Sequence, residues 1–195
     1  MNRKTIAIGL ALSLLAACKQ QAGNSAAPTV AAAKAAGTDT IAKGLAGASS
    51  DSKFVAAVKA ARLEPTFAGP GPYTVLVPDD NAFARLPAGA LDGLMKADAK
   101  PRLVKLLTMH VLPGTILSSD ITKAIDAKKG SAKLITMEGS TLTATKDGDK
   151  IVLTDPTGGK SVITGADAKR SNGVVHHIDT VLNAKARLRH GSARR

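Results

Sequence analysis

The 195-residue chain is poor in cysteine and in aromatic residues, and it contains no tryptophan. With a single cysteine, Cys18, it cannot form an intramolecular disulfide. Its aromatic side chains are one tyrosine and three phenylalanines, all between residues 54 and 83. Proteins that bind nucleic acid usually combine a basic face with aromatic stacking platforms. The scarcity of aromatic residues therefore argues against a nucleic-acid partner.

Acidic residues are scarce at both ends of the chain, and most of the formal net charge of +12 lies there. Residues 51–183 hold 17 lysines and arginines against 14 acidic residues, whereas residues 184–195 hold five cations and no acid. We interpret residues 184–195 as a basic C-terminal tail. The tail is either a solvated chain end or a contact site for an anionic partner, such as lipid head groups, polysaccharide or an acidic protein.

The apolar run of residues 5–17 is too short for a permanent membrane span, which needs about 20 residues. It follows Arg3 and Lys4, as expected for a secretory signal peptide. The run ends in Leu-Ala-Ala-Cys at Cys18, which resembles the lipobox of bacterial lipoproteins. We predict that residues 1–17 are removed and that Cys18 carries the lipid. The alternative is an ordinary signal peptide followed by a chance cysteine.

A lipid on Cys18 predicts attachment to a membrane of the bacterial cell envelope, since more than one acyl chain anchors a protein stably. Lys19 stands where an aspartate favours retention in the inner membrane of Gram-negative bacteria, so we expect the outer membrane, on its periplasmic or surface face. The segment that follows is rich in alanine, glycine, serine and threonine. Residues 18–50 are therefore predicted to be the lipidated cysteine and a flexible tether.

From residue 51 the spacing of apolar residues predicts helices first and strands second. A helix starting at residue 51 is expected to end before the Gly-Pro-Gly-Pro of residues 69–72, and a strand follows at residues 73–77. Further helices are predicted from about residue 80, at 87–95, from 101 to 111 and at 120–127. Further strands are predicted at 132–137, 141–146, 150–155, 161–164 and 174–182. This order predicts a single α+β domain over residues 51–183.

Three motifs in this region resemble the fasciclin domain family. The first is TVLVPDDNAF at residues 74–83, the second is LLTMHVLPG at residues 106–114, and the third is NGVVHHIDTVL at residues 172–182. The resemblance implies a wedge-like sandwich or meander of strands with several helices packed beside it. It also implies a non-catalytic role in adhesion or in binding a macromolecule of the envelope or the extracellular space.

The resemblance also points to candidate binding residues at Met109, His110 and Asp167. Animal adhesion members carry an aromatic residue before the histidine, where this chain has Met109. An Asp-Ile pair linked to integrin binding in the family corresponds here to Asp167-Ala168. Integrin-type recognition therefore does not carry over. Because some fasciclin-like proteins bind carotenoids, the alternative function is a carrier of a small lipophilic ligand such as a carotenoid.

Catalytic and metal-binding motifs are missing from the sequence. His176, His177 and Asp179 are suitable metal ligands, but neighbouring residues of a strand point to opposite faces, so one histidine is expected to be structural. Asp79 and Asp80 follow a strand and are interpreted as helix-capping residues rather than an acid–base pair. We predict neither an enzyme nor a protein with a resident metal or cofactor.

Overall fold

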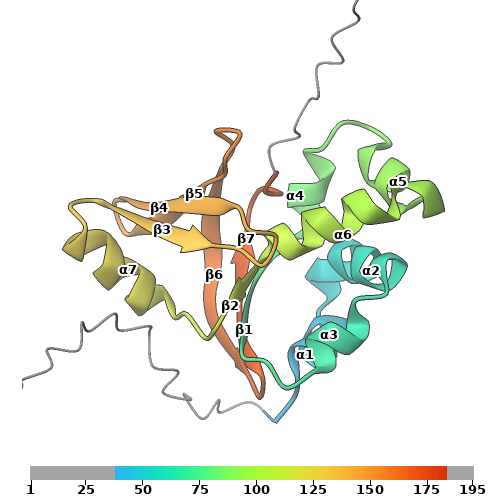
Figure 1. Cartoon of the computed structure of the whole chain (residues 1–195), viewed down its shortest axis with the longest axis horizontal. Coiled ribbons are helices and arrows are strands. Elements are labelled where there is room, and N and C mark those ends of the chain that lie inside the picture. The colour runs from blue at the N-terminus through green and yellow to red at the C-terminus, as the bar shows by residue number, and fades with distance from the viewer. Residues whose placement is uncertain (1–37, 184–195) are drawn as a thin grey trace, which may run out of the picture.

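The computed structural model describes residues 38–183. Helices and strands follow one another as the α+β prediction requires, with helices dominating the first half and strands the second (Figure 1). The elements are α1 (Ile41–Ala46), η1 (Ser49–Asp51), α2 (Ser52–Ala61), α3 (Glu64–Ala68), β1 (Tyr73–Pro78), α4 (Asp80–Ala84), α5 (Ala90–Met95), η2 (Ala97–Ala99), α6 (Lys100–Met109), β2 (Val111–Pro113), α7 (Ser118–Ala127), β3 (Ser131–Ile135), β4 (Thr141–Asp147), β5 (Lys150–Thr154), β6 (Lys160–Arg170) and β7 (Gly173–Ile178).

The strands form one continuous order, β2-β1-β7-β6-β5-β4-β3. Neighbours pair antiparallel except β1 and β7, which are parallel. The two ends of this order approach each other, because the backbone N–H of Met137 donates to the carbonyl of Val111 at 2.8 Å. The sheet is thus nearly closed, with α1–α6 gathered on one side of it and α7 on the other (Figure 1).

Strand β1 separates two hydrophobic cores. Val75 and Val77 point into the first, which we name the helix-side core and which also contains residues of α1, α2, α3, α4 and α6. Leu76 points into the second, the sheet-side core, which is formed by α7 and by β3, β4 and β5. A strand buried on both faces is apolar throughout rather than alternating. This explains the unbroken apolar run of residues 75–77.

Strand β6 contains a bulge and pairs with two different neighbours along its length. Its first residues pair with β5 and its later residues pair with β7, with register shifts between Ile163, Gly165 and Ala168. Asp167 lies in the bulge with a φ of 60°. A bulge bends a strand and redirects its side chains. The sequence predicted only residues 161–164 of this strand, because the alternation of apolar residues is lost where the bulge begins.

The structure corrects the expected start of the domain. Residues 39–50, predicted to be part of the tether, contain α1, whose Ile41 and Leu45 are buried in the helix-side core. Two apolar residues one helical turn apart are enough to dock a short helix, although a segment rich in alanine and glycine hides them. The predicted signal peptide, Cys18 and the predicted basic tail lie outside the described residues.

Other boundaries also differ from prediction. The helix expected between residues 51 and 69 is two helices, because Arg62 ends α2 in the left-handed conformation. The central helix ends at Met109, and Val111 begins β2 instead. The last strand ends at Ile178 rather than at residue 182. Among residues 38–183, no helix has the length and the apolar character needed to cross a membrane.

Candidate functional site

His110 is a buried residue at the end of α6. The backbone N–H of Leu182 donates to its Nε2 at 3.0 Å, so its Nδ1 carries the proton and donates to the carbonyl of Leu106 at 2.8 Å. The ring of Phe54 packs edge-on against it, with 6.4 Å between ring centroids. Burial lowers the pKa of His110 to about 4. His110 is therefore a neutral histidine that joins α6 to the segment after β7.

Met109 is also inaccessible to a partner. Its side chain is fully buried in the sheet-side core, and its sulfur lies 4.0 Å from the hydroxyl of Thr136. Met109 therefore fills space between α6 and the turn after β3. Because neither Met109 nor His110 reaches the surface in this conformation, the geometry does not favour the binding role expected for this pair.

Asp167 holds the β6 bulge against the start of α7. Its carboxylate accepts hydrogen bonds from the backbone N–H of Ser118, at 2.8 Å, and from the Ser118 hydroxyl. Its own N–H donates to Nδ1 of His176 at 3.1 Å, and Nε2 of His176 donates to the carbonyl of Ile116 at 2.8 Å. A carboxylate at a helix N-terminus is electrostatically favourable. The partners of Asp167 are thus Ser118 and His176, and not Met109 or His110.

His176 and His177 point to opposite faces of β7, as their spacing predicts. His176 is fully buried, and burial lowers its pKa. His177 lies on the other face, where its Nε2 is 3.2 Å from the carboxylate of Asp51. The hydrogen bond to Asp51 raises the pKa of His177. The two rings therefore belong to different environments and do not converge on a common ion.

Both carboxylate oxygens of Asp179 have neighbours within the domain. It accepts from the backbone N–H of Val162 at 2.8 Å and from the Thr180 hydroxyl at 3.1 Å, and Arg85 lies 3.6 Å away. The part of the chain that the structure describes contains no group of three or more histidine, cysteine or acidic side chains placed to hold an ion.

The two aspartates after β1 both cap helices. Asp79 accepts from the N–H of Ala82 at 2.6 Å and caps α4, as predicted. Asp80 instead accepts from the N–H of Lys53 at 2.9 Å and caps α2 from a distance of 27 residues in sequence. The pair is therefore structural, and its second member connects two helices that the sequence alone does not place together.

Asn172 is a structural residue that the sequence analysis named only as the start of the third family motif. Its side-chain oxygen accepts from the N–H of Ile41 at 2.8 Å. Its amide nitrogen donates to the carbonyls of Phe67 at 2.8 Å and Gly69 at 2.7 Å. The following residue must be glycine, because a Cβ on Gly173 would lie 1.9 Å from the carbonyl oxygen of Tyr73. The Asn-Gly pair thus joins α1, α3 and β1.

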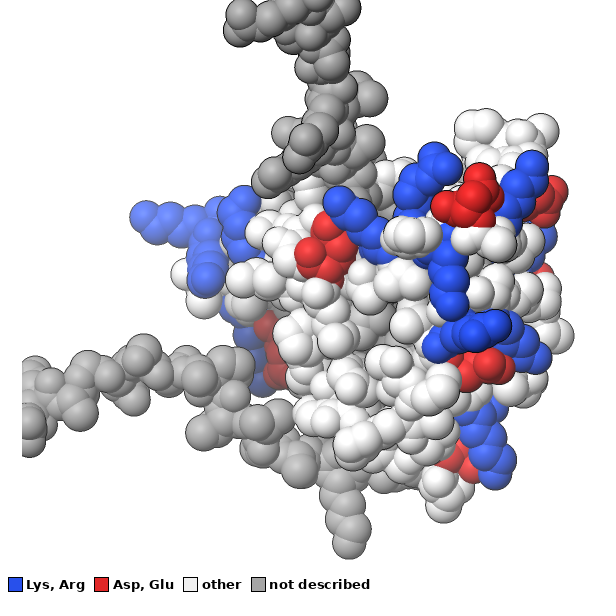
Figure 2. All heavy atoms as spheres, turned by 45° about the vertical axis from the view of Figure 1, so that its right-hand side comes forward, with Lys and Arg blue, Asp and Glu red and all other residues white. Residues whose placement is uncertain are grey.

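The helical side carries an open groove with a mostly apolar lining. A groove of about 480 Å³ lies between α1 and α2, and Lys59 is its one charged lining residue. A cavity of about 70 Å³ adjoins it, shares Leu45 and Val55 with it, and reaches Phe67. Figure 2 turns this side toward the viewer and shows a broad uncharged area between charged side chains. The sequence analysis missed the groove because it had assigned α1 to the tether.

Comparison with known proteins finds similar proteins over most of the described residues. The fasciclin domain family model matches residues 49–184. Protein sll1483 of Synechocystis sp. is 39% identical over 144 residues, which cover 73% of this chain and 72% of that protein. Transforming growth factor-beta-induced protein ig-h3 of Sus scrofa is 32% identical over 128 residues, which cover 65% of this chain and 17% of that protein.

A solved structure shows the same fold. The FAS1 domain pair from the insect cell adhesion molecule Fasciclin I matches with a TM-score of 0.67 at 19% identity, over 75% of this chain and 51% of that chain. Three observations agree with one another. They are the three sequence motifs, the α+β fold, and the match of the family model over most of the chain. This chain belongs to the fasciclin domain family.

Proposed function

We propose that this chain is a non-catalytic lipoprotein of the bacterial envelope whose fasciclin domain binds a macromolecule and so contributes to adhesion or envelope organisation. Fasciclin domains are generally adhesion-type domains without enzymatic activity. The observation that carries the proposal is the internal use of polar residues in and near the family motifs: the side chains of His110, His176 and Asn172, and that of the candidate residue Asp167, all make hydrogen bonds within the domain. Binding then falls to the exposed surface of the domain.

The membrane attachment rests on the sequence around Cys18. We expect Cys18→Ser to leave the precursor unprocessed or to move the protein from the membrane to the soluble fraction, since the thiol that accepts the lipid is lost. Cell fractionation with immunoblotting measures this, and Ser13→Ala, within the apolar run, is the control that keeps the thiol. Wild-type maturation and fractionation of Cys18→Ser would refute the lipid anchor.

Adhesion or binding is tested with the purified full chain in detergent, incubated with envelopes isolated from its host. We expect saturable retention on the envelopes and no turnover of envelope material. Retention no greater than that of an unrelated lipoprotein would refute the binding function.

The groove between α1 and α2 favours the second candidate function, a carrier of a small lipophilic ligand. Its volume lies within the range of small-molecule sites, and its lining is mostly apolar. If the carrier function is correct, protein purified from its host contains a lipophile that organic extraction and mass spectrometry detect. Val55→Trp, which fills the groove, should then remove it, whereas Ile135→Trp on an exposed strand should not. An empty wild-type protein would exclude the carrier function.

A further inference from the structure

The register of strands β3–β6 aligns four polar side chains in a row. Lys133 pairs with Thr143, Thr143 with Thr154, and Thr154 with Lys160. The row crosses four neighbouring strands, so its two lysines are separated by three strand spacings, about 14 Å at the Cα atoms. A Lys-Thr-Thr-Lys row is therefore built from four successive strands, each of which contributes one side chain.

This row lies on the face of the sheet that points away from the sheet-side core. The alternate residues of the same strands, among them Leu134, Leu142 and Leu153, are buried in that core together with Ile121 and Ile125 of α7. Helix α7 thus covers the opposite face. We name the face that carries the row the outer sheet face; it consists of residues 131, 133, 135, 141, 143, 145, 147, 150, 152, 154, 160 and 162.

The outer sheet face is rich in hydroxyl groups and positively charged. It presents Thr141, Thr143, Thr145 and Thr154 together with Lys133, Lys150 and Lys160, and its one acidic residue is Asp147, opposite Lys150 in the hairpin. All three lysines are exposed. Within residues 38–183 none of these three lysines has a carboxylate within 4.0 Å, although the amine of Lys133 lies 3.5 Å from the Thr143 hydroxyl.

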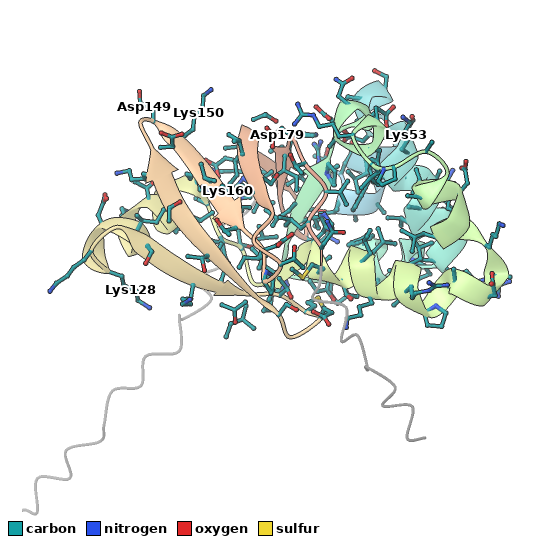
Figure 3. All side chains as sticks on the ribbon, turned by 90° about the horizontal axis from the view of Figure 1, so that it is seen from above. Lys53, Lys128, Asp149, Lys150, Lys160 and Asp179 are labelled. Atoms are coloured by element: carbon teal, nitrogen blue, oxygen red, sulfur yellow. The ribbon has the colours of Figure 1, made fainter. Side chains whose placement is uncertain are left out.

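The arrangement in space keeps the positive charges apart. Lys150 lies beside Asp149 at the tip of the β4–β5 hairpin, and Lys160 lies nearer the middle of the sheet (Figure 3). Separated ammonium groups with hydroxyls between them match a long partner on which negative charges alternate with hydroxyl groups. Ile135, which is 63% exposed and lies opposite Thr141, adds an apolar contact at one edge.

We propose that the outer sheet face binds a linear acidic polysaccharide, with the lysines meeting its carboxylate or sulfate groups and the threonine hydroxyls meeting its sugar hydroxyls. This inference rests on the proposed binding function and names its partner class. An anionic lipid surface would meet the same lysines, but it would leave the central threonines against head groups without a matching row of hydroxyls. A polysaccharide therefore matches more of the side chains on the outer sheet face than a lipid surface does.

The experiment measures binding of the full chain in detergent to polygalacturonate oligomers by calorimetry, with neutral dextran as the comparison. We expect Lys133→Glu with Lys160→Glu to weaken binding about tenfold or more, because two attractive contacts become repulsive. Lys96→Glu with Lys123→Glu changes the net charge equally at two exposed positions, one after α5 and one in α7, and should have an effect of about twofold or less. Thr143→Val with Thr154→Val removes only hydroxyls and should weaken binding without changing its salt dependence.

Each other outcome overturns the inference in a distinguishable way. Equal losses in both charge variants would mean unspecific attraction. Binding to phosphatidylglycerol vesicles but not to polygalacturonate, lost in Lys133→Glu with Lys160→Glu, would assign the face to a membrane. If the chain binds host envelopes but neither probe, the polysaccharide inference fails while the proposed function stands. If it also fails to bind envelopes, the proposed function fails.

Discussion

Phe83→Ala is expected to lower the free energy of unfolding by about 3–5 kcal/mol, a large share of the total of a single domain. Phe83 belongs to the first family motif and lies in the last turn of α4. Its side chain is 4% exposed and packs in the helix-side core, where Val77 and Ala82 also lie. Removing the ring leaves a cavity that the surrounding helices cannot fill without moving.

Urea unfolding of the full chain in detergent, followed by circular dichroism, measures this loss. Ile135→Ala is the matched control, because Ile135 is 63% exposed and its truncation should change the stability by less than about 0.5 kcal/mol. The result that would contradict a core role is a Phe83→Ala protein that unfolds at the wild-type urea concentration.

Acidification from pH 6.5 to pH 4 is expected to destabilise the domain by about 3 kcal/mol through His110 alone. The native state keeps His110 neutral down to its pKa of about 4, whereas the unfolded chain protonates this side chain near pH 6.5. Over this interval the unfolded state binds more protons than the native state, so its free energy falls relative to the native state as the pH decreases. The loss is complete below about pH 4.

The other two histidines of the described domain act in opposite directions. Burial lowers the pKa of His176, so it adds to the acid destabilisation. The pKa of His177 is raised by its hydrogen bond to Asp51, so it stabilises the fold at low pH and this contribution disappears as the pH rises through its native pKa. The net change over the interval should still be destabilising, because two of the three histidines, His110 and His176, are fully buried, and the hydrogen-bond partners of His110 are backbone groups rather than a carboxylate.

Urea unfolding at several pH values, together with NMR titration of the imidazole signals, tests the assignment. His110→Gln, which retains an acceptor and a donor but does not titrate, should have a lower stability at pH 7 and a flatter dependence on pH. Titration of the His110 ring near pH 6.5 in the native state, or an unchanged slope in His110→Gln, would show that this histidine is not the buried neutral group.

The sequence predicted most elements because their signals are local. Asp147-Gly148 between alternating residues indicated the hairpin of β4 and β5, and the structure places its two-residue turn one position later, at Gly148 and Asp149. Helix α4 follows from a capping aspartate at Asp79. Helix α1 was missed because only Ile41 and Leu45 mark it. The parallel pairing of β1 with β7 was also inaccessible, because it joins segments about 100 residues apart and depends on the complete fold.

The candidate site was less predictable than the fold. The opposite orientation of His176 and His177 follows from strand geometry and is confirmed. The roles of Met109 and Asp167 depend instead on what the fold places around them: a buried gap between α6 and β3 for the first, and the start of α7 for the second. The outer sheet face emerges only from the strand register, since its Lys-Thr-Thr-Lys row is spread over residues 133–160.

The decisive comparison is to determine the stability and the envelope binding of Phe83→Ala in parallel, at a temperature where its folded fraction is known. If the family motifs build the fold and the exposed surface binds, the variant is strongly destabilised, and its binding falls only in proportion to its unfolded fraction. A Phe83→Ala protein that is stable and fully folded but no longer binds envelopes would contradict this and would place the binding site in the motif itself.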